Sequence, residues 1–179
     1  MSSVSGLLRN EVLFKALSSY HLMKYNPKVK NKNLLMIVDY ALPSSSKRLF
    51  VINIERKDII RAHHVAHGKG SSDPFNPAKA IKFGNKIGSG MSSVGPAVTG
   101  NTYFGVYGRS LRLHGLSDTN SNMLVRAVVL HKSNYVTDAF INQYGYCGRS
   151  LGCLSVDPAI KDGLIDLVGN GTFIFLNGD

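Results

Sequence analysis

Apolar residues near the start of the chain recur at helical spacing. They include positions 13, 14, 17 and 20 and, within 23–25, Met23 and Tyr25, with polar residues between them. Positions three to four residues apart share one face of a helix, so the pattern predicts an amphipathic helix over residues 11–25. Asn26-Pro27 follows and is typical of a helix end.

The hydrophobic pattern changes after residue 34 to short apolar, β-branched runs separated by polar turns. Such runs favour strands joined as hairpins, for example around the turn Glu55–Asp58. The polar, Gly/Ser/Pro-rich connection 68–95 is long enough to predict a functional or flexible loop. The pattern predicts strands over 35–42, 48–54, 59–66, 97–107, 110–113, 127–131, 154–156 and 172–176.

Three shorter helices are also expected. Residues 117–120 offer caps for a helix over 121–126, and residues 137–143 have the composition of a short helix. Asp157-Pro158 places a capping aspartate before a first-turn proline, which predicts a helix to about Val168. The sum is a mainly β fold with an N-terminal helix and short flanking helices, for which a β-sandwich or barrel is favoured over a doubly wound sheet.

The composition fits one globular domain over residues 1–179, with the helical segment 1–30 packed on it. Of 179 residues, 44% are hydrophobic and 18% charged. The net charge of +10 suits an anionic partner or a basic solvated surface. Basic residues are not gathered with aromatic ones, so nucleic acid is not expected as a partner. The chain has no apolar run of membrane-spanning length and no secretory signal in residues 1–10, which fits a cytosolic protein or a trimmed mature form.

The residues best suited to chemistry lie around Cys153. The thiolate is the nucleophilic form of cysteine, and a histidine that exchanges protons near neutral pH is its usual activator. Gly152 lets the backbone approach a reacting carbonyl, Arg149 adds positive potential, and Ser150 can bond within the turn. His131 ends an apolar strand and is the candidate base. Taken alone, a buried unreactive cysteine and a structural histidine remain the commoner alternatives.

The surrounding segments are similar to a known family. Gly148-Arg149-Ser150-Leu151-Gly152-Cys153, after Val129-Leu130-His131 and Asn134-Tyr135-Val136, resembles the L,D-transpeptidase (YkuD-like) catalytic domain family, and most closely its murein L,D-transpeptidase subgroup. The resemblance covers most of the chain from about residue 15. It extends to residues 65–69, to residues 108–116, and to Asn122 with Arg126.

The resemblance implies a β-sandwich-like or mixed sheet and a cysteine acyltransferase. Cys153 would attack a peptidoglycan stem peptide after the L-centre of a diamino acid, release terminal D-alanine and form a thioester. His131 would be the base, and a second stem or water would resolve the thioester. Family members are acylated by carbapenems and work in the periplasm or cell wall, although a cytoplasmic location is not excluded here. The remaining site residues expected to form the oxyanion hole or bind substrate are Gly152, Ser150, Arg149, Leu151, Leu154, Tyr135, His67, Gly68, His114 and Arg126.

Four residues depart from the usual family pattern. Leu151 stands where histidine is common, Leu154 where proline is common, Ser155 where asparagine or arginine is common, and Lys132 where glycine is common. These departures leave the nucleophile and base in place. They leave transfer, hydrolysis by an L,D-carboxypeptidase or endopeptidase, and a catalytically silent peptidoglycan-binding module as alternatives.

The other histidines and the second cysteine favour no further chemistry. His63, His64 and His67 lack the glutamate of the helical zinc motif and fall in a strand pattern, so no metal or other cofactor is expected. Cys147 is expected to be an inert thiol, with a redox bond to Cys153 as the alternative. The oligomeric state and the residue that orients His131 are left open, although a backbone carbonyl or a serine would suit the latter.

Overall fold

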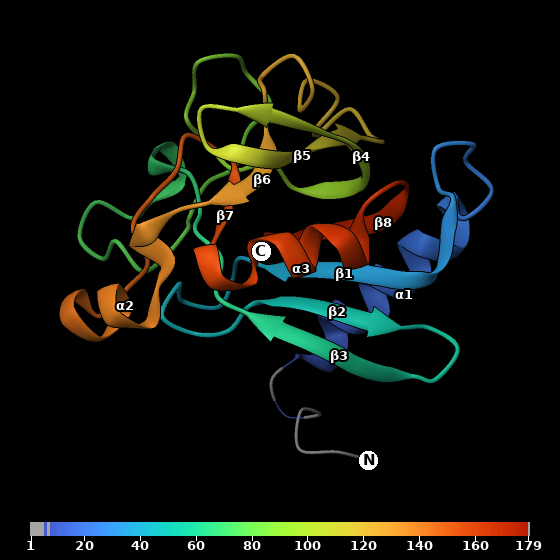
Figure 1. The fold of residues 1–179 in the computed structure, drawn as a ribbon, viewed down its shortest axis with the longest axis horizontal. Helices are drawn as coiled ribbons and strands as arrows, with labels where there is room; N and C mark the ends of the chain where they lie inside the picture. Colours follow the sequence, from blue (N-terminus) through green and yellow to red (C-terminus); the bar gives the residue numbers. More distant parts are fainter. Residues whose placement is uncertain (1–5, 7, 179) are drawn as a thin grey trace.

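A computed structural model describes residue 6 and residues 8–178 of the chain. These residues form three helices and eight strands (Figure 1). In chain order they are α1 (Asn10–Met23), β1 (Asn31–Asp39), β2 (Leu49–Asn53), β3 (Asp58–His63), β4 (Gly95–Gly105), β5 (Gly108–Gly115), β6 (Val129–Lys132), α2 (Asp138–Tyr144), β7 (Leu154–Val156), α3 (Pro158–Val168) and β8 (Thr172–Asn177). Short 3₁₀ turns occupy Lys69–Ser71 and Asn134–Val136.

The eight strands form one mixed sheet in the order β3-β2-β1-β8-β4-β5-β6-β7. Two pairs are parallel, β1 with β8 and β6 with β7, and the other pairs are antiparallel. The prediction of a mainly β fold with a mixed sheet and flanking helices is confirmed. In Figure 1 the strands β1–β3 and the strands β4–β7 form the lower and upper parts of the molecule.

Alternate side chains of β1 pack into two different hydrophobic cores. Met36 and Val38 pack with α3 and with β5–β7, whereas Leu35 and Ile37 pack with α1. Successive side chains of a strand point to opposite faces, so α1 and α3 cover opposite faces of this half of the sheet. The first core joins β1 and β2 to β6, which carries His131, and to β7, which begins one residue after Cys153. The position of the candidate site is therefore tied to the main core.

Local sequence signals account for the ends of the later helices. The Asp157 carboxylate accepts from the Ala159 N–H at 2.7 Å, and Pro158 is the first residue of α3. The Thr137 hydroxyl accepts from the Phe140 N–H at the start of α2, and Gly145 closes that helix in the left-handed conformation. The predicted helices over 137–143 and 158–168 are confirmed, as is the N-terminal helix.

The helix predicted over residues 121–126 is absent and is replaced by consecutive turns. The side chain of the expected cap, Asn120, bonds instead to the Ser117 N–H and to the Pro96 carbonyl. Because the long-range bond to Pro96 holds the segment against the start of β4, the chain continues as turns up to Ala127, which has a left-handed φ of 53°.

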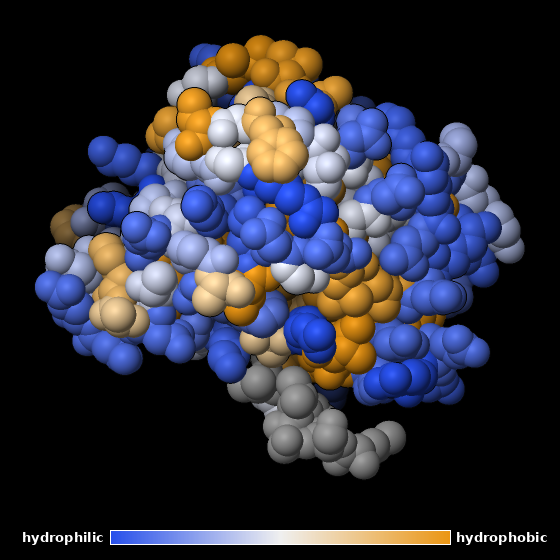
Figure 2. Space-filling model, in the orientation of Figure 1, coloured by the Kyte–Doolittle hydropathy of each residue, from blue (hydrophilic) through white to orange (hydrophobic). Residues whose placement is uncertain are grey.

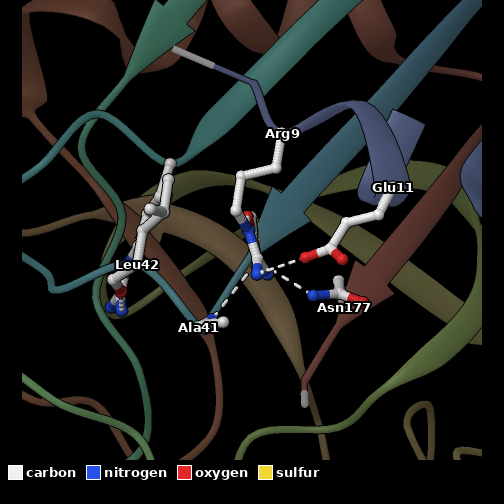
Figure 3. Close-up of polar contacts among 7 residues, drawn as sticks. Arg9, Glu11, Ala41, Leu42 and Asn177 are labelled. Atoms are coloured by element: carbon white, nitrogen blue, oxygen red, sulfur yellow. Dashed lines mark hydrogen bonds and ion pairs between the residues drawn. The ribbon is translucent and has the colours of Figure 1, made fainter. Parts of the chain in front are cut away.

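Arg9 fastens the start of α1 to the sheet (Figure 3). Its guanidinium bonds both carboxylate oxygens of Asp39 at 2.9 and 3.0 Å, and it also reaches Glu11. Asp39 is fully buried at the end of β1 and accepts from Asn177 at the end of β8 and from the Ala41 N–H. Such a bidentate, charge-assisted contact fixes geometry as well as adding energy. This arrangement joins the first helix to the two central strands.

Hydrophilic residues cover much of the face seen in Figure 2, and hydrophobic ones gather at its upper rim and in a second area below the centre of the view. That rim is occupied in Figure 1 by the connections before β4 and after β5. Exposed large hydrophobic residues of these connections include Ile87 and Val125. Within the described part of the chain, no helix is long and apolar enough to cross a membrane.

Candidate active site

The segment that carries Cys153 is held between two neighbouring segments. On one side Leu154 and Ser155 pair in parallel with Leu130 and His131. On the other side the chain around His67 adds backbone bonds: Ser150 N–H to His67 O at 2.9 Å, Lys69 N–H to Ser150 O at 2.7 Å, and Ala66 N–H to Ser155 O at 3.0 Å. Bonding on both sides gives the cysteine a rigid support.

Ser150 organises the turn that precedes Cys153. Its hydroxyl donates to the Cys153 carbonyl at 2.8 Å and accepts from the Gly152 N–H at 3.1 Å. Gly152 has a φ of 113°, and a Cβ atom there would lie 2.6 Å from the Met91 carbonyl oxygen. Only glycine suits this position. The Gly152 N–H is already bonded, whereas no partner of the Cys153 N–H occurs among the described residues, so the Cys153 N–H is the better oxyanion donor.

The thiol of Cys153 is protonated in this arrangement. The sulfur lies 3.5 Å from the Ala127 carbonyl oxygen, which can only accept a hydrogen bond. Burial raises the pKa of the Cys153 thiol, while the Val129 N–H and the Arg126 cation lower that pKa. The cysteine therefore needs a base to become a nucleophile.

His131 is held by hydrogen bonds at both ring nitrogens. Nδ1 lies 2.8 Å from the Lys132 carbonyl oxygen, and Nε2 lies 3.1 Å from the Ser155 hydroxyl. A carbonyl only accepts, so Nδ1 carries the proton of the neutral ring and Nε2 is the acceptor. The Ser155 hydroxyl therefore donates to Nε2 and accepts in turn from the Tyr135 hydroxyl at 2.9 Å. A backbone carbonyl and a serine together orient the imidazole.

An aromatic ring shields His131 from water. Tyr107, from the turn between β4 and β5, stacks on the imidazole with ring centroids 4.1 Å apart. Only 3% of His131 is exposed, and burial lowers the pKa of its imidazole, although the Lys132 carbonyl opposes this shift. The ring is therefore neutral near pH 7, as a base that accepts a proton must be.

Ser155 and His131 lie on one face of β6 and β7, and Cys153 lies directly before β7. His131 is the register partner of Ser155, so their side chains point to the same side, and Cys153 stands two residues before Ser155 in the turn that leads into the strand. No hydrogen bond joins Cys153 to His131, since Ser155 occupies Nε2 and the thiol is directed to Ala127. Proton transfer requires the thiol to turn from Ala127 and the Ser155 O–H to turn from Nε2.

A groove of about 470 Å³ opens beside this face. It extends from Tyr107, which covers His131, to Tyr135, which is linked to His131 through Ser155. Its aromatic walls, with a few polar side chains between them, are typical of a ligand-binding groove. The residues lining it are Val106, Tyr107, Lys132, Ser133, Asn134, Tyr135 and Phe140.

His67 was expected to bind substrate, but its side chain is fully buried. Its Nδ1 accepts from the Arg48 guanidinium at 2.9 Å, and its Nε2 lies 2.9 Å from the Ser72 hydroxyl. Its backbone, not its imidazole, supports the cysteine segment. Gly68 lies against Gly152 and Gly90, where a Cβ atom would meet the Gly90 carbonyl at 2.2 Å.

The other expected residues are divided between the site and its surroundings. Leu151 is 77% exposed at the tip of the cysteine turn, and Arg149 is exposed beside it. Leu154 is buried in the main core and faces away from Cys153. The His114 ring lies against Gly100 on β4 and has no hydrogen bond to the cysteine segment. Arg126 lies beside Gly152, bonded to the loop before β4.

Cys147 is a free thiol in the interior of the protein. It is buried, donates from sulfur to the Ser44 carbonyl at 3.0 Å, and is not bonded to Cys153. Burial raises the pKa of its thiol to about 11. His63 and His64 line a separate pocket with Lys47, Asp138 and Asp157. Among residues 6 and 8–178, no group of three or more His, Cys, Asp or Glu side chains could hold a metal ion.

Sequence reasoning missed the residues that link the site together. Ser155 was noted only as a departure from the family pattern. Tyr107 had no sequence feature that indicated a role in the site, apart from its place beside the turn at Gly108. Arg48 sits in an apolar strand pattern, which is the one sequence signal for a buried charge. Their roles depend on contacts with residues that are far away in the sequence.

The buried state of His67 predicts a dependence of stability on pH. Burial and the nearby Arg48 and Arg149 cations lower the pKa of His67 to about 3, against an unfolded value of about 6.5. Above pH 6.5 the group adds nothing to pH dependence. As the pH falls from 6.5 towards 3, only the unfolded chain binds this proton, so the free energy of unfolding falls by up to about 1.4 kcal/mol per pH unit.

Denaturant unfolding at pH 7, 5 and 4 measures this effect against His67→Asn. The variant keeps a neutral polar group but lacks the titrating imidazole, so its stability should fall less steeply below pH 6.5. The other histidines are common to both proteins and cancel in the comparison. Equal slopes in the two proteins would contradict a neutral, buried His67.

Comparison with known proteins gives one consistent result. The family described as L,D-transpeptidase catalytic domain matches residues 5–177. No functionally curated protein matches the chain in sequence. Among solved structures, the helical cell shape determining protein Pgp2 from Campylobacter jejuni aligns with a TM-score of 0.51 at 13% identity, covering 82% of this chain and 48% of Pgp2. Its K307A mutant aligns with a TM-score of 0.53 at 10% identity, covering 96% and 57%.

An L,D-transpeptidase from Mycobacterium smegmatis aligns with a TM-score of 0.48 at 13% identity, over 82% of this chain and 59% of that one. The chain thus spans less than two thirds of each of these proteins. At such low identity the Pgp2 alignments show a shared fold, whereas the family match covers nearly the whole sequence. The chain belongs to the L,D-transpeptidase catalytic domain family.

Proposed function

We propose that this protein is an L,D-transpeptidase that acts on peptidoglycan stem peptides through a Cys153 thioester. The observation that carries the proposal is that Cys153, directly before β7, lies beside the paired residues Ser155 and His131 of β7 and β6, next to the groove. Family membership supports the reaction class. Residues 1–179 would act as one catalytic domain, in the periplasm or cell wall where its substrate lies.

The proposed reaction has two halves. The Cys153 thiol gives its proton to Nε2 of His131, and the thiolate attacks the carbonyl carbon after the L-centre of the diamino acid. The Cys153 N–H stabilises the negative oxygen of the tetrahedral intermediate. As the C–N bond breaks, the His131 imidazolium returns the proton to the amine of the leaving D-alanine. An acceptor amine then loses a proton to His131 and attacks the thioester carbonyl; as the C–S bond breaks, the imidazolium returns this proton to the Cys153 sulfur, which restores the thiol and the neutral base.

Mass spectrometry of tetrapeptide-stem muropeptides tests this proposal. Incubation with the protein should shorten the donor stem by one alanine and yield a cross-linked dimer. If shortened stems form without dimer even when a second stem is in excess, the protein is a hydrolase and the transferase proposal is wrong. If stem masses do not change and a carbapenem leaves no adduct, the protein is a silent binding module and the enzymatic proposal is wrong.

Ser155 and Tyr135 are expected to hold the His131 ring in place until the Ser155 hydroxyl turns away and leaves Nε2 free for the thiol proton. Ser155→Ala removes the hydrogen bond at Nε2, leaving the ring with one anchor at Lys132. Loss of orientation near a reacting atom should slow acylation of Cys153 by a carbapenem about ten- to hundredfold. Tyr135→Phe, which removes only the outer hydroxyl, should slow acylation less.

Stopped-flow absorbance of the carbapenem measures these rates, and thermal denaturation checks that the variants fold. Nitrogen NMR of His131 should show the Nδ1–H tautomer in the wild-type protein. Wild-type acylation rates in Ser155→Ala would show that the serine does not position the base.

A further inference from the structure

The loop before β4 is fastened to the turns after β5 by two clamps. In the first, Asn122 donates two hydrogen bonds to Asn85: its backbone N–H to the Asn85 side-chain oxygen, and its side-chain amide to the Asn85 backbone carbonyl. In the second, Arg126 donates to the Gly84 carbonyl, the Ser93 hydroxyl and the Met91 carbonyl. The two clamps differ in one respect, since only the second carries a charge.

The Arg126 guanidinium lies directly beside the residue that precedes Cys153. Its Nη2 atom is 3.1 Å from the place where a Cβ of residue 152 would stand. Because residue 152 is glycine, the cation and the Met91 carbonyl can both approach the cysteine turn. Glycine at position 152 therefore allows the cation to come close and also allows the positive φ.

Arg126 keeps donor capacity and charge that the clamp does not use. A guanidinium has five N–H groups, and three are used by Gly84, Ser93 and Met91, which leaves two. Within the described residues no carboxylate forms an ion pair with Arg126. All three of its partners are neutral, so its charge is not neutralised by a neighbour.

The next residue brings a second group to the cysteine. Ala127 adopts a φ of 53°, which is uncommon for a residue with a side chain, and its carbonyl accepts from the Cys153 thiol. Strained backbone of this kind is retained where surrounding structure enforces it, often at functional sites. Arg126 and Ala127 thus place a cation and an acceptor on the same cysteine.

We infer that Arg126 is the cationic partner of the Cys153 thiolate, and that it stabilises the nucleophile while fastening the loop before β4. The inference rests on the proposed function only in taking Cys153 as the nucleophile. When Cys153 loses its proton to His131 or to solvent, Arg126 stays protonated and its field favours the negative sulfur. Mutual effects on pKa agree with this, since Arg126 lowers the pKa of Cys153 and Cys153 raises that of Arg126.

This role was expected of Arg149, the basic residue of the cysteine motif itself. Arg149 is exposed to solvent, where water screens its charge. Arg126 is partly buried, and burial lowers the pKa of its guanidinium, so its charge is less screened. The closer influence on the thiol comes from a residue 27 positions away in sequence (153 − 126 = 27).

Alkylation of Cys153 by iodoacetamide as a function of pH tests the inference without peptidoglycan. Peptide mapping by mass spectrometry separates Cys153 from the buried Cys147. Removal of a nearby opposite charge shifts a pKa by about one unit or more. Arg126→Met should therefore raise the alkylation midpoint by about one pH unit and slow alkylation near neutral pH about tenfold. Arg126→Lys, which keeps the charge, should lie close to the wild-type protein.

Three further variants separate charge from loop fastening and from folding. Asn122→Ala weakens the uncharged clamp, and Lys86→Met removes an exposed charge from the same loop; both should leave the midpoint unchanged. Arg126→Gln keeps donors for the loop carbonyls without the charge, and its alkylation midpoint should also rise by about one pH unit. This variant provides the test if Arg126→Met does not fold. An unshifted midpoint in Arg126→Gln, or an equal shift in Asn122→Ala, would overturn the inference. A negative muropeptide assay would instead affect only the proposed function.

Discussion

Replacing Cys153 by alanine should abolish both the covalent carbapenem adduct and the release of D-alanine from tetrapeptide stems. The substitution removes the only atom on the β6–β7 face that can form a thioester, while the backbone bonds of Ser150 and Ser155 that hold the segment are retained. Intact-protein mass spectrometry should show a carbapenem adduct on the wild-type protein and none on Cys153→Ala.

His131→Gln should slow carbapenem acylation of Cys153 without abolishing it. Glutamine can bond Ser155 but cannot accept the thiol proton near pH 7, so acylation should fall about 10²- to 10⁴-fold, the usual contribution of a general base. The matched control is Cys147→Ala, which removes the other thiol from its buried contact with Ser44 and should leave the adduct intact. An adduct that persists in Cys153→Ala and disappears in Cys147→Ala would reverse the assignment of the nucleophile.

Local sequence signals predicted the elements well where a few neighbouring residues decide the outcome. Asp157-Pro158 marked the start of α3, and the turn after Asn53 marked the hairpin of β2 and β3. The helix expected over 121–126 failed because its cap, Asn120, bonds to Pro96 on another element. The parallel pairing of β6 with β7 also had no local signal, since it depends on the path of the chain between the strands.

In the candidate site, too, the sequence indicated what neighbouring residues decide and not what long-range contacts decide. Cys153 and His131 were recognisable from the chain, and Gly152 from its place before the cysteine. The link between them was not, because Ser155 reaches His131 only through strand register and Tyr107 covers it from a distant hairpin. The buried side of the site was hidden for the same reason. Arg48 and His67 stand 19 residues apart in sequence and meet only in the fold.

Arg48 is the residue whose loss should destabilise the fold most. It is fully buried, yet its partners are neutral: Val65 O at 2.8 and 3.0 Å, Leu42 O at 3.0 Å and His67 Nδ1 at 2.9 Å. Burial lowers the pKa of its guanidinium to about 10, so it remains charged at neutral pH. Its planar donors join the segment after β1 to the segment that supports the cysteine.

Arg48→Met should lower the free energy of unfolding by about 3 kcal/mol. Each buried acceptor left without a donor costs about 1–3 kcal/mol, and part of that sum is offset because a charge no longer has to be buried. For a chain of this size the midpoint of thermal unfolding should fall by roughly 6–12 °C. Arg48→Lys should also destabilise the protein, because a single ammonium cannot reach the carbonyls of both Leu42 and Val65.

The control is Arg61→Met on β3, whose guanidinium is exposed and bonds only the neighbouring Ile60 carbonyl, so its effect should stay within about 0.5 kcal/mol. A melting temperature for Arg48→Met within 2 °C of wild type, about the shift that a loss of under 1 kcal/mol gives, would contradict the assigned role. The same variant should slow Cys153 acylation even well below its melting temperature. The reason is that Val65, His67 and the backbone bonds from His67 to Ser150 form one continuous path from Arg48 to the cysteine turn.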